Sequence, residues 1–340
     1  MTSQIVENFT FYKTSGISLQ AIDQSIQEYV KSVPRNGWEL VRFRIRNREI
    51  LTLDPSPTQS TYFRWEAIYE ALIQLSNLTS LPDIDFIVCV GDSLHPDAAL
   101  FFRKYGVPIF AFAKSKNDVV SILMPDSEAL SKGFYERVLT DTSQGRMVFP
   151  WHTKEEKAFW RGATTGIDHV GNYFLDYHNY QEFPRVKLVQ SSAKYPYLID
   201  AKLTVLAQAD PRVFDLLSPY TGTFVSVIDH LRYKYQILID GNTCTYSRAY
   251  WQLFSDCLIF KQTSPNIQWY YCCLSPYVHY IPLAYDLSDL KEKIEWARIH
   301  DAEAQQIVAS ANDFAQKNLK KEDVYFYLLL LLQKYGELQR

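Results

Sequence analysis

Apolar residues recur at helical spacing in two segments of the N-terminal third. Within residues 18–32 the apolar side chains lie three or four positions apart, which predicts an amphipathic helix, and residues 64–77 predict a second one. The apolar positions of the first helix are Leu19, Ile22, Ile26 and Val30.

Between these helices the pattern changes to a period of two. Apolar residues alternate with arginines over 41–46, as in a half-buried strand with a solvated arginine face, and 50–53 can return as the second strand of a hairpin. Continuous apolar runs follow at 86–90 and 107–112. Runs of this kind, separated by helical stretches, predict strands of a parallel sheet that is covered on both faces.

After about residue 150 the pattern starts again and ends in a helical tail. The chain is therefore predicted to be an α/β protein with two halves of similar size. The strand-sized runs of the second half are 197–200, 224–228, 235–239, 258–260 and 277–281, and the helices of the tail are 287–299, 301–317 and 321–337.

Composition narrows the class of protein. The length of 340 residues suggests about two domains, and 47% apolar with 21% charged residues is typical of a packed globular chain. Only 12 residues are glycine, and neither G-x-G-x-x-G nor G-x-x-x-x-G-K-[ST] occurs, so the two commonest glycine-rich phosphate loops are excluded. The net charge of −3 argues against a nucleic-acid partner.

The sequence also carries signals about compartment. The first residues, MTSQIVENFTFYKTSG, lack the basic and apolar regions of a secretory signal, and the longest apolar run, Tyr325–Leu332, is too short to span a bilayer. The five cysteines have no zinc-ligand spacing, which suggests reduced thiols. We therefore expect a cytoplasmic protein without a transmembrane segment, with peripheral contact to the inner membrane left open.

Aspartates that follow strand-like runs are the first candidates for chemistry. Asp92 follows the run at 86–90, Asp200 ends the run at 197–200, and Asp240 follows the run at 235–239. Ligands of open α/β sheets bind beyond the carboxyl ends of the strands. Each aspartate is therefore a candidate base or ligand holder, although a helix cap or a turn is the commoner role for such a residue.

Two short segments combine an arginine with small and hydroxyl residues. Residues 159–166 read FWRGATTG, and residues 240–248 read DGNTCTYSR. Arginine offers a rigid fork of donors to a phosphate, and glycine allows close approach. Either segment could hold an anion, the second at a helix start, or could be an ordinary turn.

The evidence for a metal site is weak. Asp83 and Asp85 match the D-x-D motif of metal-dependent glycosyltransferases, but the tripeptide is common by chance. None of the seven histidines has ligand spacing, and neither G-x-S-x-G nor H-E-x-x-H occurs. We therefore expect neither a metal nor another cofactor.

At these residues the chain resembles glycosyltransferase family 90. This family includes fungal capsule-associated xylosyltransferases, animal protein O-glucosyltransferases of the Rumi type, and bacterial enzymes linked to lipopolysaccharide. The matching segments, in family order, are 159–166, 185–192, 195–204, 228–248, 253–261 and 275–290.

The resemblance implies a GT-B architecture, in which two Rossmann-like domains face each other across a cleft. Residues 1–150 would form the acceptor-side domain and 151–315 the donor domain, with a C-terminal helix at 316–340 returning to the first. It also implies an inverting, metal-independent transfer from a UDP-sugar.

The resemblance also implies roles for individual residues. Asp92 falls at the position of the catalytic base, with Asp126 as a second choice, and His230 resembles a histidine near the acceptor. Ala163 stands where animal members have a serine, for which Thr164 or Thr165 can substitute. The donor-binding residues would be Arg161, Gly162, Ala163, Thr164, Arg185, Asn242, Thr243, Thr245, Tyr246, Ser247 and Arg248.

Three functions follow as expectations. The first is transfer of a sugar from a UDP-sugar to a saccharide or lipid-linked saccharide, in lipopolysaccharide or capsule synthesis. The second is protein O-glycosylation. The third is a catalytically inactive relative that only binds nucleotide or glycan.

Overall fold

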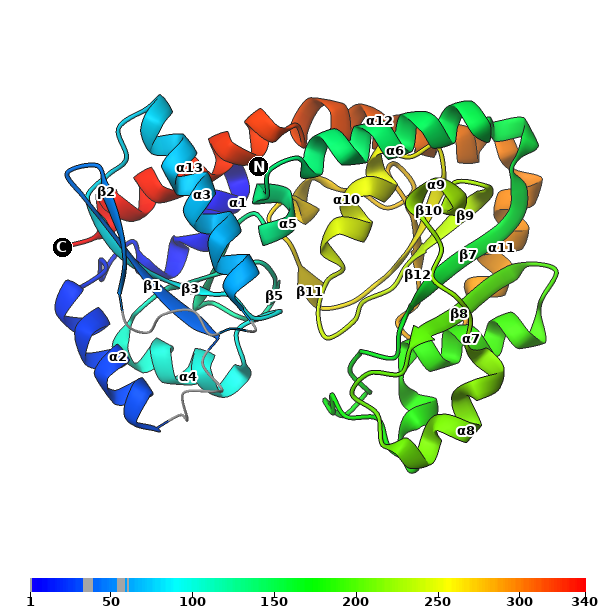
Figure 1. Ribbon diagram of the computed structural model, residues 1–340, viewed down its shortest axis with the longest axis horizontal. Helices are drawn as coiled ribbons and strands as arrows, with labels where there is room; N and C mark the ends of the chain where they lie inside the picture. Colours follow the sequence, from blue (N-terminus) through cyan, green and yellow to red (C-terminus); the bar gives the residue numbers. More distant parts are fainter. Residues whose placement is uncertain (1, 33–38, 54–58, 60) are drawn as a thin grey trace. The chain divides into compact units, whose positions relative to one another are not determined.

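The computed structural model describes residues 2–32, 39–53, 59 and 61–340, which divide into two compact units (Figure 1). The first unit combines Met1–Tyr135 with Pro265–Cys273 and Leu319–Arg340. The second combines Glu136–Ser264 with Leu274–Asn318. The predicted boundary at residue 150 therefore lies inside the second unit. The first unit also includes two later segments of the chain, which follow parts of the second unit in the sequence.

The first unit contains a mixed five-stranded sheet in the order β2-β1-β3-β4-β6. Strand β1 is antiparallel to β2 and β3, whereas β3, β4 and β6 are parallel, so the predicted hairpin and the two predicted apolar strands are confirmed. The strands are β1 (Leu40–Arg46), β2 (Glu49–Leu53), β3 (Ile84–Cys89), β4 (Ile109–Ala111) and β6 (Ser121–Leu123).

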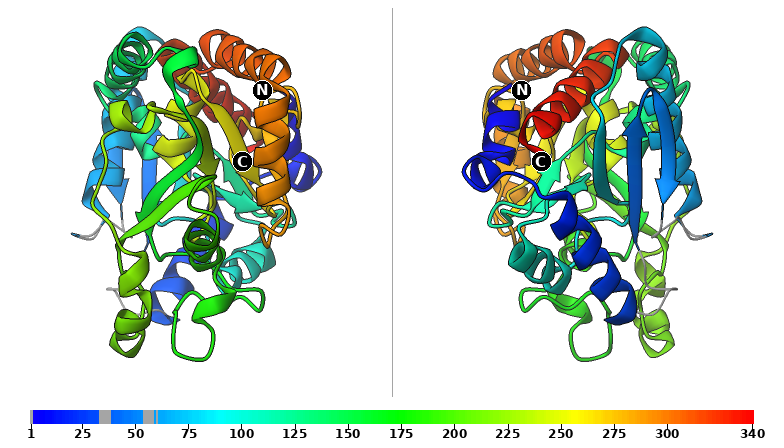
Figure 2. Two further views of the ribbon diagram at one scale, coloured as in Figure 1. Left: turned by 90° about the vertical axis from the view of Figure 1, so that its right-hand side faces the viewer. Right: turned by 90° about the vertical axis from the view of Figure 1, so that its left-hand side faces the viewer.

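The C-terminal helix α13 (Lys321–Leu338) completes the first unit. It packs against β3 and three helices of that unit, and the red α13 lies beside the blue α1 in the right-hand view of Figure 2. Seven of its apolar and aromatic residues are buried there, from Val324 to Tyr335. Among the described residues, no helix combines the length and the apolar character that a membrane span needs. The helices of this unit are α1 (Thr2–Asn8), α2 (Leu19–Ser32), α3 (Tyr62–Leu78), α4 (Pro96–Tyr105), α5 (Ser127–Leu130) and α13, and a short ladder joins β5 (Lys114–Ser115) to β11 (Asn266–Ile267).

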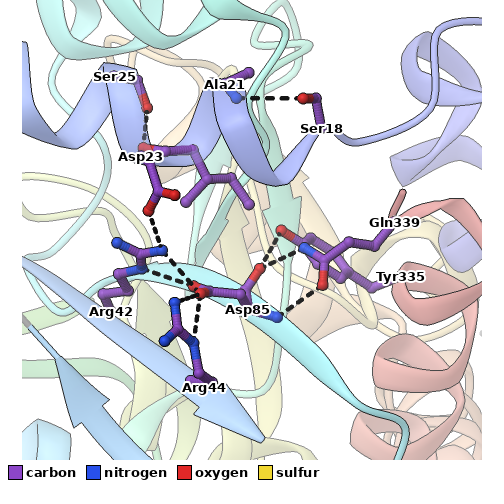
Figure 3. Close-up of polar contacts among 10 residues, drawn as sticks. Ser18, Ala21, Asp23, Ser25, Arg42, Arg44, Asp85, Tyr335 and Gln339 are labelled. Atoms are coloured by element: carbon purple, nitrogen blue, oxygen red, sulfur yellow. Dashed lines mark hydrogen bonds and ion pairs between the residues drawn. The ribbon is translucent and has the colours of Figure 1, made fainter.

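A buried aspartate links β1, β3 and α13 (Figure 3). The fully buried Asp85 carboxylate binds Arg42 at 2.7 Å and Arg44 at 2.6 Å, and its backbone exchanges two hydrogen bonds with the Gln339 side chain. Asp83 accepts a hydrogen bond from the backbone of Asn47. The D-x-D aspartates are therefore engaged in the fold, and the prediction of a solvated arginine face is wrong for Arg42, which is buried.

The second unit contains a five-stranded parallel sheet in the order β8-β7-β9-β10-β12. This is a doubly wound order: β8 is added on one side of β7, and β9, β10 and β12 are added on the other side. The strand order therefore reverses between β7 and β9. The α/β class and the two Rossmann-like domains expected from the resemblance are thus confirmed. The strands are β7 (Glu155–Ala163), β8 (Ile199–Val205), β9 (Tyr233–Leu238), β10 (Leu258–Gln262) and β12 (Ile281–Leu283).

Helices cover both faces of this sheet (Figure 1). Helix α10 packs against β9 and α12, while α7 packs against β8 and α11 against β7 and β12. The predicted helices of the tail are confirmed. The helices are α6 (Phe134–Val148), α7 (Pro184–Lys194), α8 (Phe214–Leu217), α9 (Val227–His230), α10 (Tyr246–Phe254), α11 (Leu290–Ile299) and α12 (Asp301–Asn318).

Two predicted strands of the second unit are wrong. Residues 224–228 run into helix α9, because the Ser226 hydroxyl caps it by accepting from the backbone of Asp229. Residues 277–280 form a turn in which Tyr277 has a φ of 59°, and the strand begins only at Ile281. Asp200, predicted at the end of a strand, is instead the second residue of β8.

Candidate functional site

The strand order of the second unit locates a candidate site. Open α/β sheets bind ligands beyond the carboxyl ends of the strands, where the strand order reverses. Here the reversal lies between β7, which ends at Ala163, and β9, which ends at Leu238, two residues before Asp240. Two of the three arginines singled out by the sequence, Arg185 and Arg248, reach this place.

Arg185 lies in the first turn of α7 and is buried. Its Nη1 donates to the Ala163 carbonyl at 3.1 Å and to the Thr165 hydroxyl at 2.8 Å, and its Nε donates to the Asp240 carbonyl at 2.9 Å. One guanidinium therefore bridges the ends of β7 and β9. Its positive charge is held at the point where the strand order reverses.

Arg248 lies in the first turn of α10 and comes to the same strand end from the other side. Its Nη2 donates to the Arg161 carbonyl at 2.5 Å. Its Nη1 is buried and has no hydrogen-bond partner among the described residues. Burial lowers the pKa of Arg248 to about 10. A buried cation with an unused donor is costly to the fold, and an anion is the ligand that would relieve the cost.

The indole of Trp160 lies beneath both guanidinium groups. The ring is fully buried, with the Arg185 Cζ 5.5 Å and the Arg248 Cζ 6.0 Å from its centroid. Gly162 makes room for it, since a Cβ at that position would lie 2.5 Å from the ring. Trp160 therefore supports the arginines from the core and is closed to stacking on a ligand.

The two threonines that follow β7 have different tasks. The Thr164 hydroxyl is buried and exchanges hydrogen bonds with the backbone of Ala207, at 2.5 and 2.8 Å. Thr165 binds Arg185, and a Cβ on Gly241 would lie 2.9 Å from Arg185 and 3.2 Å from the Thr165 hydroxyl. Thr165, which was only an alternative in the sequence, is thus the threonine at the site.

The loop at 242–247 leads directly into α10. A hydrogen bond of 2.9 Å from the Gly241 amide to the Thr243 carbonyl closes the turn, and Thr245 is the N-cap of the helix. The buried Thr243 hydroxyl has no hydrogen-bond partner in the part of the chain that the structure describes. Asp240 accepts from the Ser264 hydroxyl at 2.6 Å. The predicted residues Asn242, Tyr246 and Ser247 lie partly buried in this segment.

Arg161, the arginine of FWRGATTG, has a structural role. Its guanidinium binds the Asp200 carboxylate at 2.8 Å and lies 4.2 Å from the centroid of the Phe159 ring. It also donates to the Asp200 carbonyl at 3.0 Å. These contacts give Arg161 a structural role and leave Arg185 and Arg248 as the candidate anion-binding arginines.

His230 is buried in the same unit. Its ring makes edge contacts with Phe159 and Trp251, and its Nδ1 lies 3.2 Å from the Gln236 side-chain oxygen. Burial, reinforced by the charges of Arg248 and Arg161, lowers the pKa of His230 to about 3. The imidazole is therefore neutral at physiological pH, and an acceptor-side role for it stays a prediction.

Asp92, the predicted base, follows β3 in the first unit. Its Oδ1 accepts from Arg64 Nη2 at 2.7 Å, and its side chain is 39% exposed. The same guanidinium donates to the Val90 carbonyl at 2.9 Å, which ties the carboxylate to the end of the strand. Asp92 is thus an oriented carboxylate with access to solvent.

Asp126, the second choice for the base, is the N-cap of α5. It is buried and accepts from the backbone amides of Glu128 and Ala129, both at 3.1 Å. Burial, together with the charge of Glu128, raises the pKa of Asp126 to about 7. A capping carboxylate enclosed in this way is poorly placed to receive a proton from a substrate, so the geometry favours Asp92.

This raised pKa predicts an effect of pH on stability. Because the Asp126 carboxyl group has a higher pKa in the folded protein than in the unfolded chain, its protonation stabilises the fold. This stabilisation is complete below about pH 4 and is lost as pH rises through about 7. Asp126→Asn keeps a capping oxygen but cannot ionise. Urea unfolding at pH 5 and pH 8 should therefore show the wild type losing stability relative to this variant. Parallel losses in both proteins would contradict the prediction, and Asp97→Asn on the surface of α4 is the control.

Comparison with known proteins places these residues in a family. Residues 57–340 match the model for glycosyl transferase family 90. The chain belongs to glycosyl transferase family 90. The match covers the carboxylate Asp92 and both arginines at the end of β7.

Curated relatives of this family 90 chain are protein O-glucosyltransferases. Protein O-glucosyltransferase 2 of Danio rerio is 31% identical over 325 residues, which are 93% of this chain and 59% of the relative. Human protein O-glucosyltransferase 3 is 28% identical, with the same coverage. The family 90 chain therefore spans less than two thirds of the length of these relatives.

More distant likenesses come from solved structures. The Anabaena HepE protein, solved in complex with UDP and glucose, matches with a TM-score of 0.43 and 10% identity, over 81% of this chain and 67% of that protein. The sucrose-phosphate synthase of Thermosynechococcus elongatus matches with a TM-score of 0.38 and 13% identity. The match covers 79% of this chain and 61% of that protein.

Sequence reasoning missed partners of two candidate residues of this family 90 chain, one in each unit. Neither Arg64, which orients Asp92, nor Ser264, which binds Asp240, was a candidate. Both lie far along the chain from their partners, in segments without a motif. No group of three or more metal-ligating side chains occurs in residues 2–32, 39–53 and 61–340.

Proposed function

We propose that the protein transfers a sugar from a UDP-sugar to a hydroxyl group of a protein. The observation that carries this proposal is the buried Arg248 guanidinium, whose Nη1 has no partner among the described residues. The diphosphate of UDP would supply the missing acceptor. Arg185, the Thr165 hydroxyl and the first turn of α10 would contribute further donors around it.

Asp92 is the proposed base. In an inverting transfer, the acceptor oxygen attacks the anomeric carbon while the bond from that carbon to the phosphate oxygen breaks. The proton of the acceptor hydroxyl passes to the Asp92 carboxylate, and UDP leaves with the bonding electron pair. Arg185 and Arg248 would stabilise the negative charge that develops on the leaving diphosphate.

The relatives favour a protein as the acceptor. Those found by sequence are named protein O-glucosyltransferases, which supports glucose as the sugar and a protein hydroxyl as the acceptor. A lipopolysaccharide or capsule acceptor, our first expectation from the sequence, has no comparable support. A cytoplasmic location stays a prediction from the sequence.

The proposal is tested by binding and by turnover. Calorimetry should show that UDP binds the protein, and UDP-glucose should release UDP, slowly with water as acceptor and faster with a protein that gains the mass of one hexose. UDP binding without release of UDP from any UDP-sugar would instead indicate the inactive, nucleotide-binding relative. Failure to bind either nucleotide would refute the proposed donor site.

Turnover should be independent of divalent metal. The Asp85 carboxylate is occupied by Arg42 and Arg44, and the charge facing the diphosphate would come from Arg185 and Arg248. EDTA and Asp83→Asn are each expected to leave UDP release from UDP-glucose within about twofold of the untreated wild type. A loss that added Mg²⁺ or Mn²⁺ restores would show that the reaction needs a metal.

A further inference from the structure

Two adjacent thiols lie where the chain passes from one unit to the other. Cys272 and Cys273 end the segment Pro265–Cys273 of the first unit, and Leu274 begins the next segment of the second unit. The two sulfur atoms are 3.6 Å apart, which is a direct contact. Cys272 is exposed and Cys273 is half-buried. The pair therefore combines a short sulfur–sulfur distance with access to solvent.

The rest of this segment is anchored in the first unit. Strand β11 pairs with β5, and the fully buried ring of Trp269 lies 4.7 Å from the Tyr327 ring of α13, between centroids. The segment ends in a tight 3-10 turn, in which the Cys273 amide donates to the Tyr270 carbonyl at 3.0 Å. The peptide group that joins the two cysteines thus carries a hydrogen bond of this turn.

Adjacent cysteines differ from ordinary disulfide partners in their spacing. Neighbouring Cα atoms are about 3.8 Å apart across a trans peptide bond, whereas the Cα atoms of ordinary disulfides are roughly 4.4 to 6.8 Å apart. A disulfide between neighbours is therefore strained, and strained or exposed disulfides are reduced easily. Such a bond suits reversible oxidation better than permanent stabilisation of a fold.

We propose that Cys272 and Cys273 form a site of reversible oxidation, whose oxidant is a low-molecular-weight disulfide. One cysteine thiolate attacks a sulfur of that disulfide, and one half of the oxidant leaves as a thiolate that takes up a proton. The second cysteine loses its proton and attacks the mixed disulfide, which releases the other half. The chain gives up two protons and two electrons, and the oxidant becomes two thiols.

The two steps are expected to differ in rate. Burial and the adjacent Cys273 raise the pKa of Cys272, so little of this thiol is ionised at neutral pH and its attack on the oxidant is slow. The second attack takes place within the chain, across the 3.6 Å contact, and is favoured by proximity. A mixed disulfide should therefore not accumulate in the wild type.

The first test identifies the product by mass. The full chain is incubated with excess oxidised glutathione, remaining thiols are blocked with a maleimide, and trypsin releases both cysteines in the peptide 262–291. This peptide should carry no maleimide and lack two hydrogen atoms, while the buried Cys89, Cys244 and Cys257 are still thiols. Reduced glutathione should restore the dithiol. An unmodified peptide, a persistent glutathione adduct, or a disulfide that reduced glutathione does not open would each overturn the inference.

Single variants are the matched controls for this product. Cys272→Ser and Cys273→Ser each remove the thiol that would close the ring, so glutathione should stay attached to the remaining cysteine in at least one of them. Urea unfolding of the reduced proteins checks that both variants fold like the wild type. If neither folded variant keeps an adduct under conditions that oxidise the wild type, the two-step exchange is wrong.

A second measurement follows the turn itself. Ring closure is expected to twist the peptide group between the cysteines and to break the bond from the Cys273 amide to Tyr270. Deuterium exchange at this amide should then become about 2- to 10-fold faster in the oxidised protein, while the ladder between β5 and β11 keeps its rates. Equal rates at the Cys273 amide in both forms would contradict this effect on the turn. Neither measurement involves a UDP-sugar, so both outcomes are independent of the proposed function.

Discussion

Replacing Arg248 with methionine is expected to weaken UDP binding by roughly 10- to 150-fold, which corresponds to the 1.5 to 3 kcal/mol typical of hydrogen bonds to charged groups. The ligand-free variant should be at least as stable as the wild type. Burial lowers the pKa of Arg248 to about 10, below its usual 12.5, so carrying the charge at pH 7 costs folding free energy. Methionine keeps the contact with Trp160 and removes that cost. Calorimetry with UDP and urea unfolding without it measure the two effects.

Two further arginine variants are the controls for this prediction. Arg161→Met leaves Asp200 without its ion pair, so it should lower stability while UDP affinity is largely kept. Arg232→Met removes an exposed pair with Glu155 and should change neither quantity noticeably. If Arg161→Met weakened UDP binding as much as Arg248→Met, Arg161 would be the anion ligand and our assignment would be wrong.

Asp92→Asn is expected to lower turnover by about 10²- to 10⁴-fold, the usual contribution of a general base. The amide keeps the size of the side chain and an oxygen for the 2.7 Å contact with Arg64, but it cannot take up the proton of an acceptor. UDP affinity should remain close to that of the wild type, because the donor-site arginines belong to the second unit. Initial rates of UDP release and calorimetry on the same preparation measure the two quantities.

The matched control for this loss is an aspartate nearby in the same unit. Asp97 lies in the first turn of α4, is exposed, and its carboxylate lies 3.7 Å from His95 Nδ1. Asp97→Asn should therefore retain wild-type turnover. Equal activity of Asp92→Asn and Asp97→Asn would exclude Asp92 as the base.

The spacing of apolar residues predicted those helices and strands that bury one face against a core. The helices at 19–32 and 62–78 and the hairpin of β1 and β2 follow directly from spacing, because one face of each packs on a core. The segment 224–228 looked like a strand because it is apolar. There the capping hydroxyl of Ser226 favours a helix, which apolar periodicity does not report.

The sequence brought Arg185 and Arg248 forward as candidates, but it did not supply the contacts that they make. Arg185 and Arg248 stood in motifs long enough to recognise. The sequence could not distinguish Thr164 from Thr165, because only the fold turns one hydroxyl to Ala207 and the other to Arg185. The partners of Asp85 and Asp92 lie more than 25 residues away along the chain, at 43 positions for Arg42 and 28 for Arg64. Their pairing depends on the order of strands, which composition does not contain.

The C-terminal helix has a consequence for how the protein forms during synthesis. The chain leaves the first unit at residue 135, revisits it for 265–273 and returns for good at 319. The last residues of the chain then bury Asp85, through Tyr335 and Gln339. On a ribosome, the strands of the first unit therefore emerge before the second unit, and α13 emerges after it. The unit that holds Asp92 is begun before the second unit and completed after it.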